Sequence, residues 1–203
     1  MHEGRLQMLD TPENVYNRPA NVFTAKFIGS PSMNMIECSY GGGCLTVGGQ
    51  QICLPDMWSE IVEKQAGARL YLGIRPEHMV LKQGFEENAL AATVKYIEDY
   101  GNRYGIYLEC EGREMIAVRE GEIPEPGTKV WIAADFAKIH LFDRDSQKSL
   151  GYPAEIPVMK KVSAMPGPDR TGKAGAKGKE AEKGKEGEKG GMTGGITNQY
   201  QYV

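Results

Sequence analysis

Two short runs of this sequence have the composition of phosphate-binding loops. Residues 167–174 (GPDRTGKA) approach the P-loop pattern, in which backbone amides hold phosphates and a final Ser or Thr hydroxyl holds magnesium. Ala174 replaces that hydroxyl, and Gly/Lys-rich sequence surrounds the run. Residues 47–50 (VGGQ) are similar to the end of the LSGGQ signature, which presents amides to a nucleotide phosphate, but they lack its serine. We interpret the first run as coincidence and the second as a hairpin turn.

Cysteine and histidine are the residue types that could bind metal or act as nucleophiles. No Cys-x-x-Cys pair occurs among the four cysteines Cys38, Cys44, Cys53 and Cys110. We expect reduced thiols packed in the core. The histidines His2, His78 and His140 are scattered, with no nucleophile beside them, so we interpret them as packed or solvated side chains.

Carboxylates are numerous but alternate along strands and turns, which is typical of the solvated face of a sheet. They are Glu109, Glu111, Glu114, Glu120, Glu122 and Glu125. From the residues alone we therefore predict no catalytic residue, no metal and no cofactor.

Length and charge narrow the classes of protein further. The chain has 203 residues, with 24 Lys and Arg against 27 Asp and Glu, which is enough for one domain plus appendages. The net charge of −3 argues against a generally basic nucleic-acid binder. No run is apolar enough to span a membrane and no secretory signal is visible, so we expect a soluble intracellular protein.

Elements that would position any functional group begin with two short helices in residues 1–31. Thr11-Pro12-Glu13 is a helix-opening pattern, with a capping hydroxyl, proline in the first turn and an acid near the positive end of the dipole. A second helix is expected after Pro19, with an apolar stripe that includes Phe23 and Phe27. The run Gly29-Ser30-Pro31 should end it.

Residues 32–152 have the pattern of a mainly β domain. Short alternating runs are separated by glycine turns at 41–43 and 48–49, and one helix is predicted over 56–65. Further strands are predicted at 69–75, 90–97, 104–110, 114–119 and 128–134. This spacing favours a small OB-like barrel of five strands. Residues 153–203, rich in Gly, Lys and Glu, are predicted to form a disordered tail.

Several segments together resemble a known family. They are EGRLQMLDTPENVY at 3–16, PANVF at 19–23, FIGSPSMN at 27–34, LGIRPEH at 72–78 and HLFD at 140–143. In this order and spacing the chain resembles, from residue 1 to about 152, the C-terminal part of the ATP-binding subunit of carbohydrate ABC importers of the maltose and glycerol-3-phosphate type. The resemblance implies the end of a nucleotide-binding domain and a connector at 1–31, and a regulatory OB-like, TOBE-type (MOP-like) domain at 32–152.

The positions that carry the family motifs are given structural roles by the resemblance, and no catalytic ones. They are Phe27, Ile28, Gly29, Ser30, Pro31, Met33, Asn34, Gly73, Arg75, Pro76, Glu77, Gly101, Phe142 and Asp143. Arg75 and Glu77 flank Pro76 at a strand end, where an ion pair or a backbone contact could brace the corner. The alternative is that Arg75, Glu77 and His78 contact a regulator or a partner domain.

The nucleotide-binding motifs of a full-length subunit are missing from this sequence, so we expect no ATP binding or hydrolysis by the chain itself. The leading hypothesis is a non-catalytic regulatory and dimerising portion, with a split-gene or truncated origin. Its partners would be another ATP-binding subunit or a separate nucleotide-binding half, importer membrane subunits indirectly, and copies of itself. It would then lie in the cytoplasm at the inner face of the membrane. The alternative is a stand-alone OB-fold module that binds a sugar or an oxyanion.

Overall fold

Glycine turns set the first hairpins of the chain. The computed structural model describes residues 3–65 and 69–156. Strand β1 (Asn34–Gly41) turns into β2 (Cys44–Val47) through Gly42 and Gly43, whose φ angles are +60° and +81°. Strand β2 turns into β3 (Gln50–Cys53) through Gly48, at φ +58°. These left-handed conformations favour glycine, which confirms that residues 47–50 form a hairpin turn.

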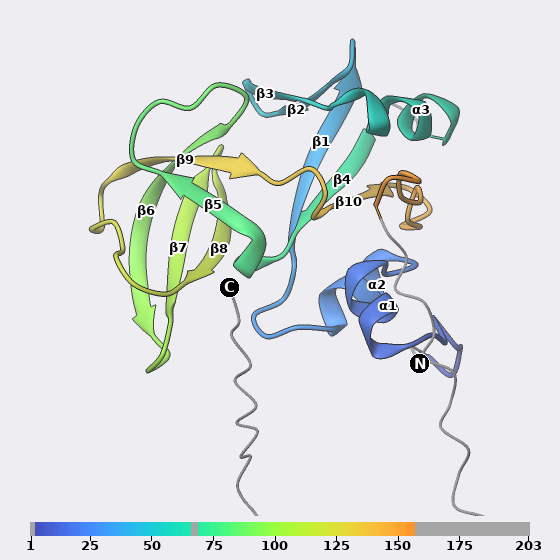
Figure 1. The fold of residues 1–203 in the computed structure, drawn as a ribbon, viewed down its shortest axis with the longest axis horizontal. Coiled ribbons are helices and arrows are strands. Elements are labelled where there is room, and N and C mark those ends of the chain that lie inside the picture. The colour runs from blue at the N-terminus through green and yellow to red at the C-terminus, as the bar shows by residue number, and fades with distance from the viewer. Residues whose placement is uncertain (1–2, 66–68, 157–203) are drawn as a thin grey trace, which may run out of the picture. The chain divides into compact units, whose positions relative to one another are not determined.

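Two antiparallel sheets of five strands make up the body (Figure 1). The first has the order β10-β4-β1-β2-β3, in which β4 is Arg69–Ile74 and β10 is Ile139–Asp143. Leu72 of β4 lies opposite Ile36 on one side and Leu141 on the other. The last strand of the described residues, β10, therefore completes a sheet that begins near residue 34.

The second sheet has the order β5-β9-β6-β7-β8. Its strands are β5 (Met79–Lys82), β6 (Leu90–Asp99), β7 (Tyr104–Cys110), β8 (Arg113–Arg119) and β9 (Lys129–Ala134). A bulge between Val94 and Tyr96 shifts the register of β6 against β7, and bulges bend a strand locally. The outer strands β5 and β8 also come into contact, so this sheet curls towards closure (Figure 1).

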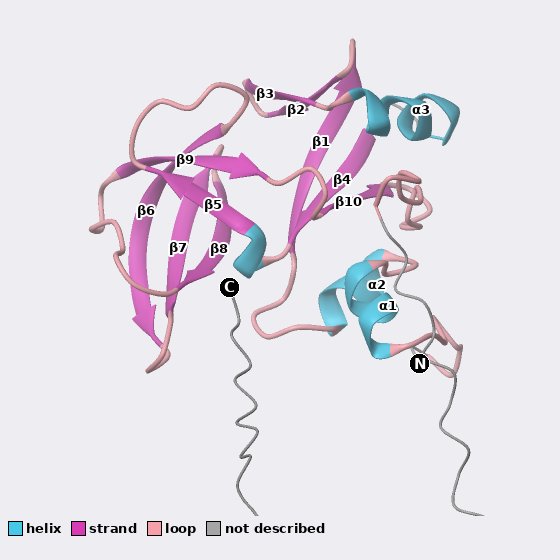
Figure 2. Ribbon diagram, viewed as in Figure 1, coloured by secondary structure: helices cyan, strands magenta, loops and turns pink. Residues whose placement is uncertain are grey.

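Helices form a minor part of the described chain (Figure 2). They are α1 (Pro12–Asn17), α2 (Val22–Phe27), α3 (Asp56–Gln65) and a 3-10 turn η1 (Pro76–His78). The two short N-terminal helices and the helix over 56–65 are confirmed. The apolar stripe expected on the second helix is partly wrong, because Val22 and Ala25 are buried while Phe27 is 72% exposed.

The core is one hydrophobic cluster to which both sheets and α3 contribute. Its members include Leu45 and Leu72 from the first sheet, Leu108 and Ile132 from the second, and Trp58 from α3. A mainly β architecture is thus confirmed. The expected number of strands is corrected from five to ten within the described residues, in two sheets that share one core.

Three side chains that end in an amide each form two hydrogen bonds with the backbone of one residue on a distant segment, one with its N–H and one with its C=O. Asn34 of β1 accepts from the Ile116 N–H at 2.8 Å and donates to the Ile116 carbonyl at 2.9 Å, which links the first sheet to β8. Gln50 of β3 does the same with Ala91 of β6, at 2.6 and 3.1 Å. Asn88 does so with Cys53. The two sheets are therefore joined by directional polar contacts as well as by the shared core.

Replacing Asn34 with leucine is expected to lower the free energy of unfolding by about 2 kcal/mol, because the change leaves buried backbone groups of Ile116 and Ile74 without their partner. Urea unfolding measures the effect. Asn102→Leu, in an exposed turn, is the matched control and should change stability by less than about 0.5 kcal/mol. Equal, small effects of the two substitutions would contradict this account.

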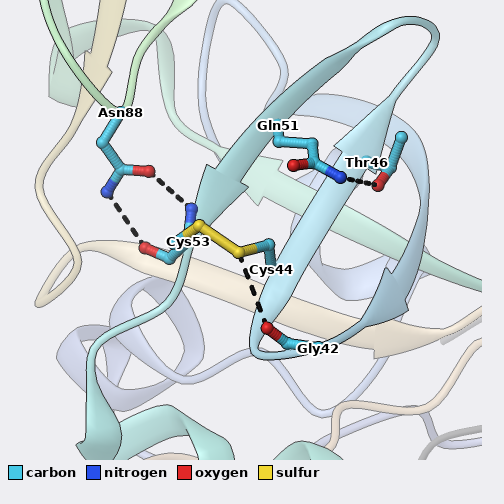
Figure 3. The surroundings of a disulfide bond; sticks show 6 residues. All are labelled: Gly42, Cys44, Thr46, Gln51, Cys53 and Asn88. Atoms are coloured by element: carbon cyan, nitrogen blue, oxygen red, sulfur yellow. Dashed lines mark hydrogen bonds between the residues drawn. A yellow bond between two sulfur atoms is a disulfide. The ribbon is translucent and has the colours of Figure 1, made fainter.

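The cysteines divide into two kinds, and here the expectation of four reduced core thiols is wrong. Cys44 and Cys53 lie opposite each other in β2 and β3 and form a disulfide (Figure 3). Cys38 and Cys110 are free and buried, as expected of core cysteines. Burial raises the pKa of the Cys38 thiol to about 12 and that of Cys110 to about 11, so both stay protonated at neutral pH.

Reduction of the Cys44–Cys53 bond is expected to lower the free energy of unfolding by about 2 kcal/mol, because the bond closes a short loop in the unfolded chain. Urea unfolding with and without a phosphine reductant measures the loss. A Cys44→Ser, Cys53→Ser variant should be as stable as the reduced protein and indifferent to reductant. If the reductant leaves the stability of the wild-type chain unchanged, the disulfide does not contribute as described.

Three predictions fall wholly or largely on residues outside the described ranges. The P-loop-like run at 167–174 and nearly all of the tail at 153–203 belong to them, as does His2. All described residues belong to one compact unit, Met1–Val162. Within the described ranges, the helices are too short and too polar to cross a membrane.

Candidate functional site

Capping side chains define the N-terminal connector, which we take as residues 11–31. Thr11 Oγ1 accepts a hydrogen bond from the Asn14 N–H at 3.3 Å at the start of α1. Asn21 Oδ1 accepts one from the Thr24 N–H at 2.8 Å at the start of α2. Such caps satisfy amides that have no partner inside the helix. The connector thus contains two six-residue helices that depend on packing against the sheets.

Arg75 ties the connector to the end of β4. It follows β4, and only 1% of it is exposed. Its Nη1 donates to the Ile28 carbonyl at 2.6 Å and its Nη2 to the Tyr16 carbonyl at 2.5 Å. The guanidinium also lies over the Tyr16 ring, 3.6 Å from the ring centre. One buried cation therefore holds the end of α1 and the residue after α2.

No carboxylate among the described residues pairs with Arg75. Of the two contacts expected at this corner, the ion pair with Glu77 is absent from the described ranges and the backbone contact is present. Glu77 is exposed. Burial lowers the pKa of Arg75 to about 10, which still leaves it cationic at neutral pH. The cation is thus held by carbonyl oxygens and an aromatic face, both of which favour a guanidinium.

Gly29 makes room for that guanidinium. Its φ is +118°, and a Cβ placed there would lie 3.0 Å from Arg75 Nη1. The peptide bond between Ser30 and Pro31 is cis. The predicted run Gly29-Ser30-Pro31 therefore ends α2 and turns the chain into β1 beside the arginine.

Other predicted positions lie on the sheet side of the same junction. Met33 and Phe142 are buried together with Val22 and Ala25 of α2 in a second, smaller hydrophobic cluster. A Cβ on Gly73 would approach Met33 Sδ to 2.7 Å, so this glycine allows close packing. Pro76 is buried at the start of η1. These residues form the surface on which the connector packs.

Three predicted positions lie away from the junction or have only local roles. Asn34 joins the sheets as described above. Gly101 has φ +94° in the turn between β6 and β7. Asp143 accepts from the Ser146 N–H at 2.8 Å, and hydrogen bonds from Ser146 lower its pKa. The family motifs therefore do not converge on one site.

His78 lies beside residues that the sequence did not connect with it. His78 and His140 line one cavity of about 170 Å³, together with Arg18 of the connector and Lys138. Although they lie far apart in the sequence, these two histidines therefore line the same cavity, and buried His140 is a packed side chain as expected. The signal that could have found the group was weak, because its members are separated by as many as 122 positions in sequence.

The side chains that could bind metal are dispersed over the described residues. Within those ranges, no three His, Cys, Asp or Glu side chains are grouped to hold a metal ion. The six carboxylates predicted for a solvated face are all exposed. Glu109 forms an ion pair with Lys95 at 2.8 Å.

Comparison with known proteins gives two matches to family models. Residues 29–79 match the model described as the MalK OB fold domain, and residues 72–142 match that of the TOBE domain. The two matches overlap at residues 72–79, the end of β4 and η1, a segment that includes Arg75.

Curated relatives match over most of the described body. The chain is 35% identical over 146 residues to the uncharacterized ABC transporter ATP-binding protein y4oS of Sinorhizobium fredii, covering 70% of this chain and 38% of that protein. It is 27% identical to the oligosaccharides import ATP-binding protein MsmX of Bacillus subtilis, with coverages of 72% and 42%. It is 32% identical to the sn-glycerol-3-phosphate import ATP-binding protein UgpC of Chromobacterium violaceum, with coverages of 80% and 44%. The chain thus spans about two fifths of the length of these relatives.

One solved structure is also similar. The molybdate-bound form of the cytoplasmic molybdate-binding protein ModG matches with a TM-score of 0.44 and 17% identity, over 53% of this chain and 94% of that one.

Proposed function

Because this chain contains the MalK-type OB fold and TOBE domains of the C-terminal part of an ABC importer ATP-binding subunit, we propose that it is the regulatory portion of such a subunit. In this role it binds and hydrolyses no nucleotide itself. It pairs ATP-binding subunits and transmits movement between their nucleotide-binding parts and the TOBE domain. Its place in the cell is then the cytoplasmic face of the membrane, beside the importer's membrane subunits.

The contact that carries this proposal is the Arg75 brace. A guanidinium bonded to the carbonyls of Tyr16 and Ile28 makes the connector and the β4–η1 corner move together. A regulator that binds the sheets with different affinity in two positions of the connector would shift the balance between those positions. Transmission through this corner needs no catalytic group.

A chimera tests transmission directly. Residues 3–156 of this chain replace the matching segment of MsmX, a full-length relative whose name identifies an oligosaccharide import activity. We expect the chimera to support uptake with ATP hydrolysis. An Arg75→Gln version should keep hydrolysis but lose most uptake, because the connector no longer moves with the sheets. Arg69→Gln, an exposed change on β4, is the control. Equal uptake by the Arg75→Gln and Arg69→Gln versions would refute transmission through Arg75.

The proposal that this chain does not itself bind nucleotide is supported by the identity of the matched domains, neither of which is a nucleotide-binding domain. Isothermal titration of the whole chain with Mg-ATP tests it. No heat above dilution is expected. Binding with a Kd of about 10 μM or tighter would contradict the proposal.

Pairing is supported by apolar side chains that are exposed in the connector and just before it. Phe27 stacks on Phe23 and is 72% exposed, and Leu9 is 84% exposed. Exposed apolar groups of this size favour association. Sedimentation equilibrium should show self-association that Leu9→Ser, Phe27→Ser weakens. A strict monomer at high concentration would contradict pairing by the isolated chain.

A further inference from the structure

We propose that the Cys44–Cys53 disulfide is a site of reversible exchange with a small thiol, and that Cys53 carries the sulfur that this thiol attacks. The exchange gives first a mixed disulfide on β3 and then, after a second thiol has reacted, a reduced pair. The inference takes from the proposed function only the cytoplasmic location, which supplies the thiol. Exchange is measured on the purified chain, so its failure is distinguishable from failure of the role in transport.

The two cysteines lie on the solvent face of the β2–β3 hairpin. Accessible and buried side chains alternate in both strands, so Leu45 and Ile52 enter the core while Cys44 and Cys53 point outwards. Cys53 is exposed and Cys44 is half-buried. Strand β3 is also the edge of the first sheet. A dissolved thiol can therefore reach the bond from the solvent side while the core stays folded.

The backbone of the hairpin keeps the two cysteines together whether or not they are bonded. Cys53 directs its N–H and its C=O to the side-chain amide of Asn88, away from β2 (Figure 3). The next residue, Leu54, donates its N–H to the Gly43 carbonyl at 2.9 Å, across the hairpin. Cys44 and Cys53 are thus a non-hydrogen-bonded pair, the kind in which facing side chains come closest. The reduced pair therefore remains in position to close again.

The other two cysteines cannot compete for the thiol. Cys38 and Cys110 are free and buried, and burial raises the pKa of their thiols to about 12 and about 11. Because the thiolate is the form that attacks a disulfide, neither exchanges at neutral pH. The chain thus has one accessible pair and two inert thiols.

The exchange consists of two balanced steps. A thiolate forms a bond with Cys53 Sγ, the bond to Cys44 Sγ breaks, and Cys44 leaves as a thiolate that takes up a proton. A second thiolate then attacks the small-molecule sulfur of the mixed disulfide, and Cys53 leaves and is protonated in turn. Two small thiols are oxidised to one disulfide, and their two electrons and two protons end on the cysteine pair. The reverse steps close the Cys44–Cys53 bond again.

The exposure of this bond distinguishes it from a structural disulfide. Exposed disulfides are the ones that thiols reduce readily, whereas structural disulfides resist the cellular thiol pool. In a cytosolic protein a disulfide is usually transient and redox-sensing. At the proposed location the Cys44–Cys53 pair therefore follows the ratio of thiol to disulfide around it. Because reduction destabilises the domain, the stability of the domain follows that ratio as well.

Glutathione is the probe that tests exchange. The oxidised, native chain is incubated with millimolar reduced glutathione, free thiols are trapped by alkylation, and the modified residues are identified by mass spectrometry. We expect Cys44 and Cys53 to become alkylated in most chains, with a mixed disulfide at Cys53 at early times. Cys38 and Cys110 should stay unmodified until urea is added. Excess oxidised glutathione should then restore the Cys44–Cys53 bond.

Single variants identify the accessible sulfur. With oxidised glutathione, Cys44→Ser, which retains exposed Cys53, should form the mixed disulfide at least about tenfold faster than Cys53→Ser. Gln51→Ser, an exposed change on the same strand that keeps the pair, should exchange at the wild-type rate. Protection of Cys38 and Cys110 from alkylation shows that each variant is folded.

A Cys44–Cys53 bond that glutathione opens only in urea would overturn the proposal, because the bond would then be a structural one. Equal rates in the two single cysteine variants, or a faster rate in Cys53→Ser, would refute Cys53 as the sulfur that is attacked.

Discussion

Replacing Arg75 with methionine is expected to lower the free energy of unfolding by about 3 kcal/mol, one of the two largest effects that this structure predicts. The substitution keeps most of the side-chain volume. It leaves the carbonyls of Tyr16 and Ile28 without their donor and removes the cation over the Tyr16 ring. Urea unfolding, followed by circular dichroism, measures the loss.

Two further variants separate the geometry of Arg75 from its charge. Arg75→Lys keeps the charge but cannot bond both carbonyls in the planar arrangement of a guanidinium, so it should recover only part of the loss. Arg69→Met, on the exposed side of the same strand, should cost less than about 0.5 kcal/mol. If Arg75→Lys were as stable as the wild-type chain, the two-carbonyl contact would not be the source of the effect.

Lowering the pH from 7.5 to 4 is expected to remove about 3 kcal/mol of stability through His140 alone. Burial, with smaller contributions from the positive charge of Arg75, His78 and Lys138, lowers the pKa of His140 to about 3. In the unfolded chain its pKa is about 6.5. The folded state therefore keeps His140 neutral. Above pH 6.5 this histidine does not reduce the free energy of unfolding. As the pH falls from 6.5 towards 3, the unfolded chain binds a proton at His140 that the folded chain does not, so the free energy of unfolding decreases.

Other groups also titrate in this range, so the prediction concerns a difference between two proteins. His140→Gln keeps a polar group near the Tyr152 hydroxyl but cannot bind a proton. The wild-type chain should lose about 2 kcal/mol more than this variant between pH 7.5 and pH 5. His78→Gln should reduce the dependence of stability on pH by less than His140→Gln does, because His78 is less buried. The same loss of stability with falling pH in the wild-type chain and in His140→Gln would refute the assignment of this pH dependence to His140.

The elements that the sequence predicted best are those bounded by glycine turns or by a clear change of period. Strands β2 and β7 and helix α3 have the predicted bounds. Strand β5 and the turn η1 were not predicted. The turn begins at Pro76 and the strand that follows it has four residues, so neither is long enough to show an alternating pattern. The division into two sheets was missed because it depends on which distant strands pair, and local periodicity carries no information about that.

The disulfide was missed for a different reason. Cys44 and Cys53 are placed symmetrically about the Gly48–Gly49 turn, so a correctly predicted hairpin already brings them opposite each other. The expectation of reduced thiols followed from the expected cell compartment, which carries no information about which cysteines lie opposite each other. Hairpin symmetry was the signal that could have identified the pair.

For the candidate site, the sequence indicated Arg75 but not the residues it contacts. A conformationally restricted corner, Arg75-Pro76, can be recognised locally. The carbonyls of Tyr16 and Ile28 lie 59 and 47 positions away and have no side-chain signature. The cavity lined by Arg18, His78, Lys138 and His140 has the same difficulty in stronger form, because these residues line one cavity only when β10 brings the end of the domain back to the connector.

The position of β10 also has a consequence for biosynthesis. This strand pairs with β4, yet the whole of the second sheet is encoded between them. A ribosome must therefore release residues 139–143 before the β4 edge can be covered, and until then that edge exposes unpaired peptide groups to neighbouring nascent chains. Translation that stalls between β9 and β10 would leave the second sheet complete, while the first sheet still lacks β10 and exposes the unpaired edge of β4. Quality-control proteases and chaperones should encounter that intermediate first.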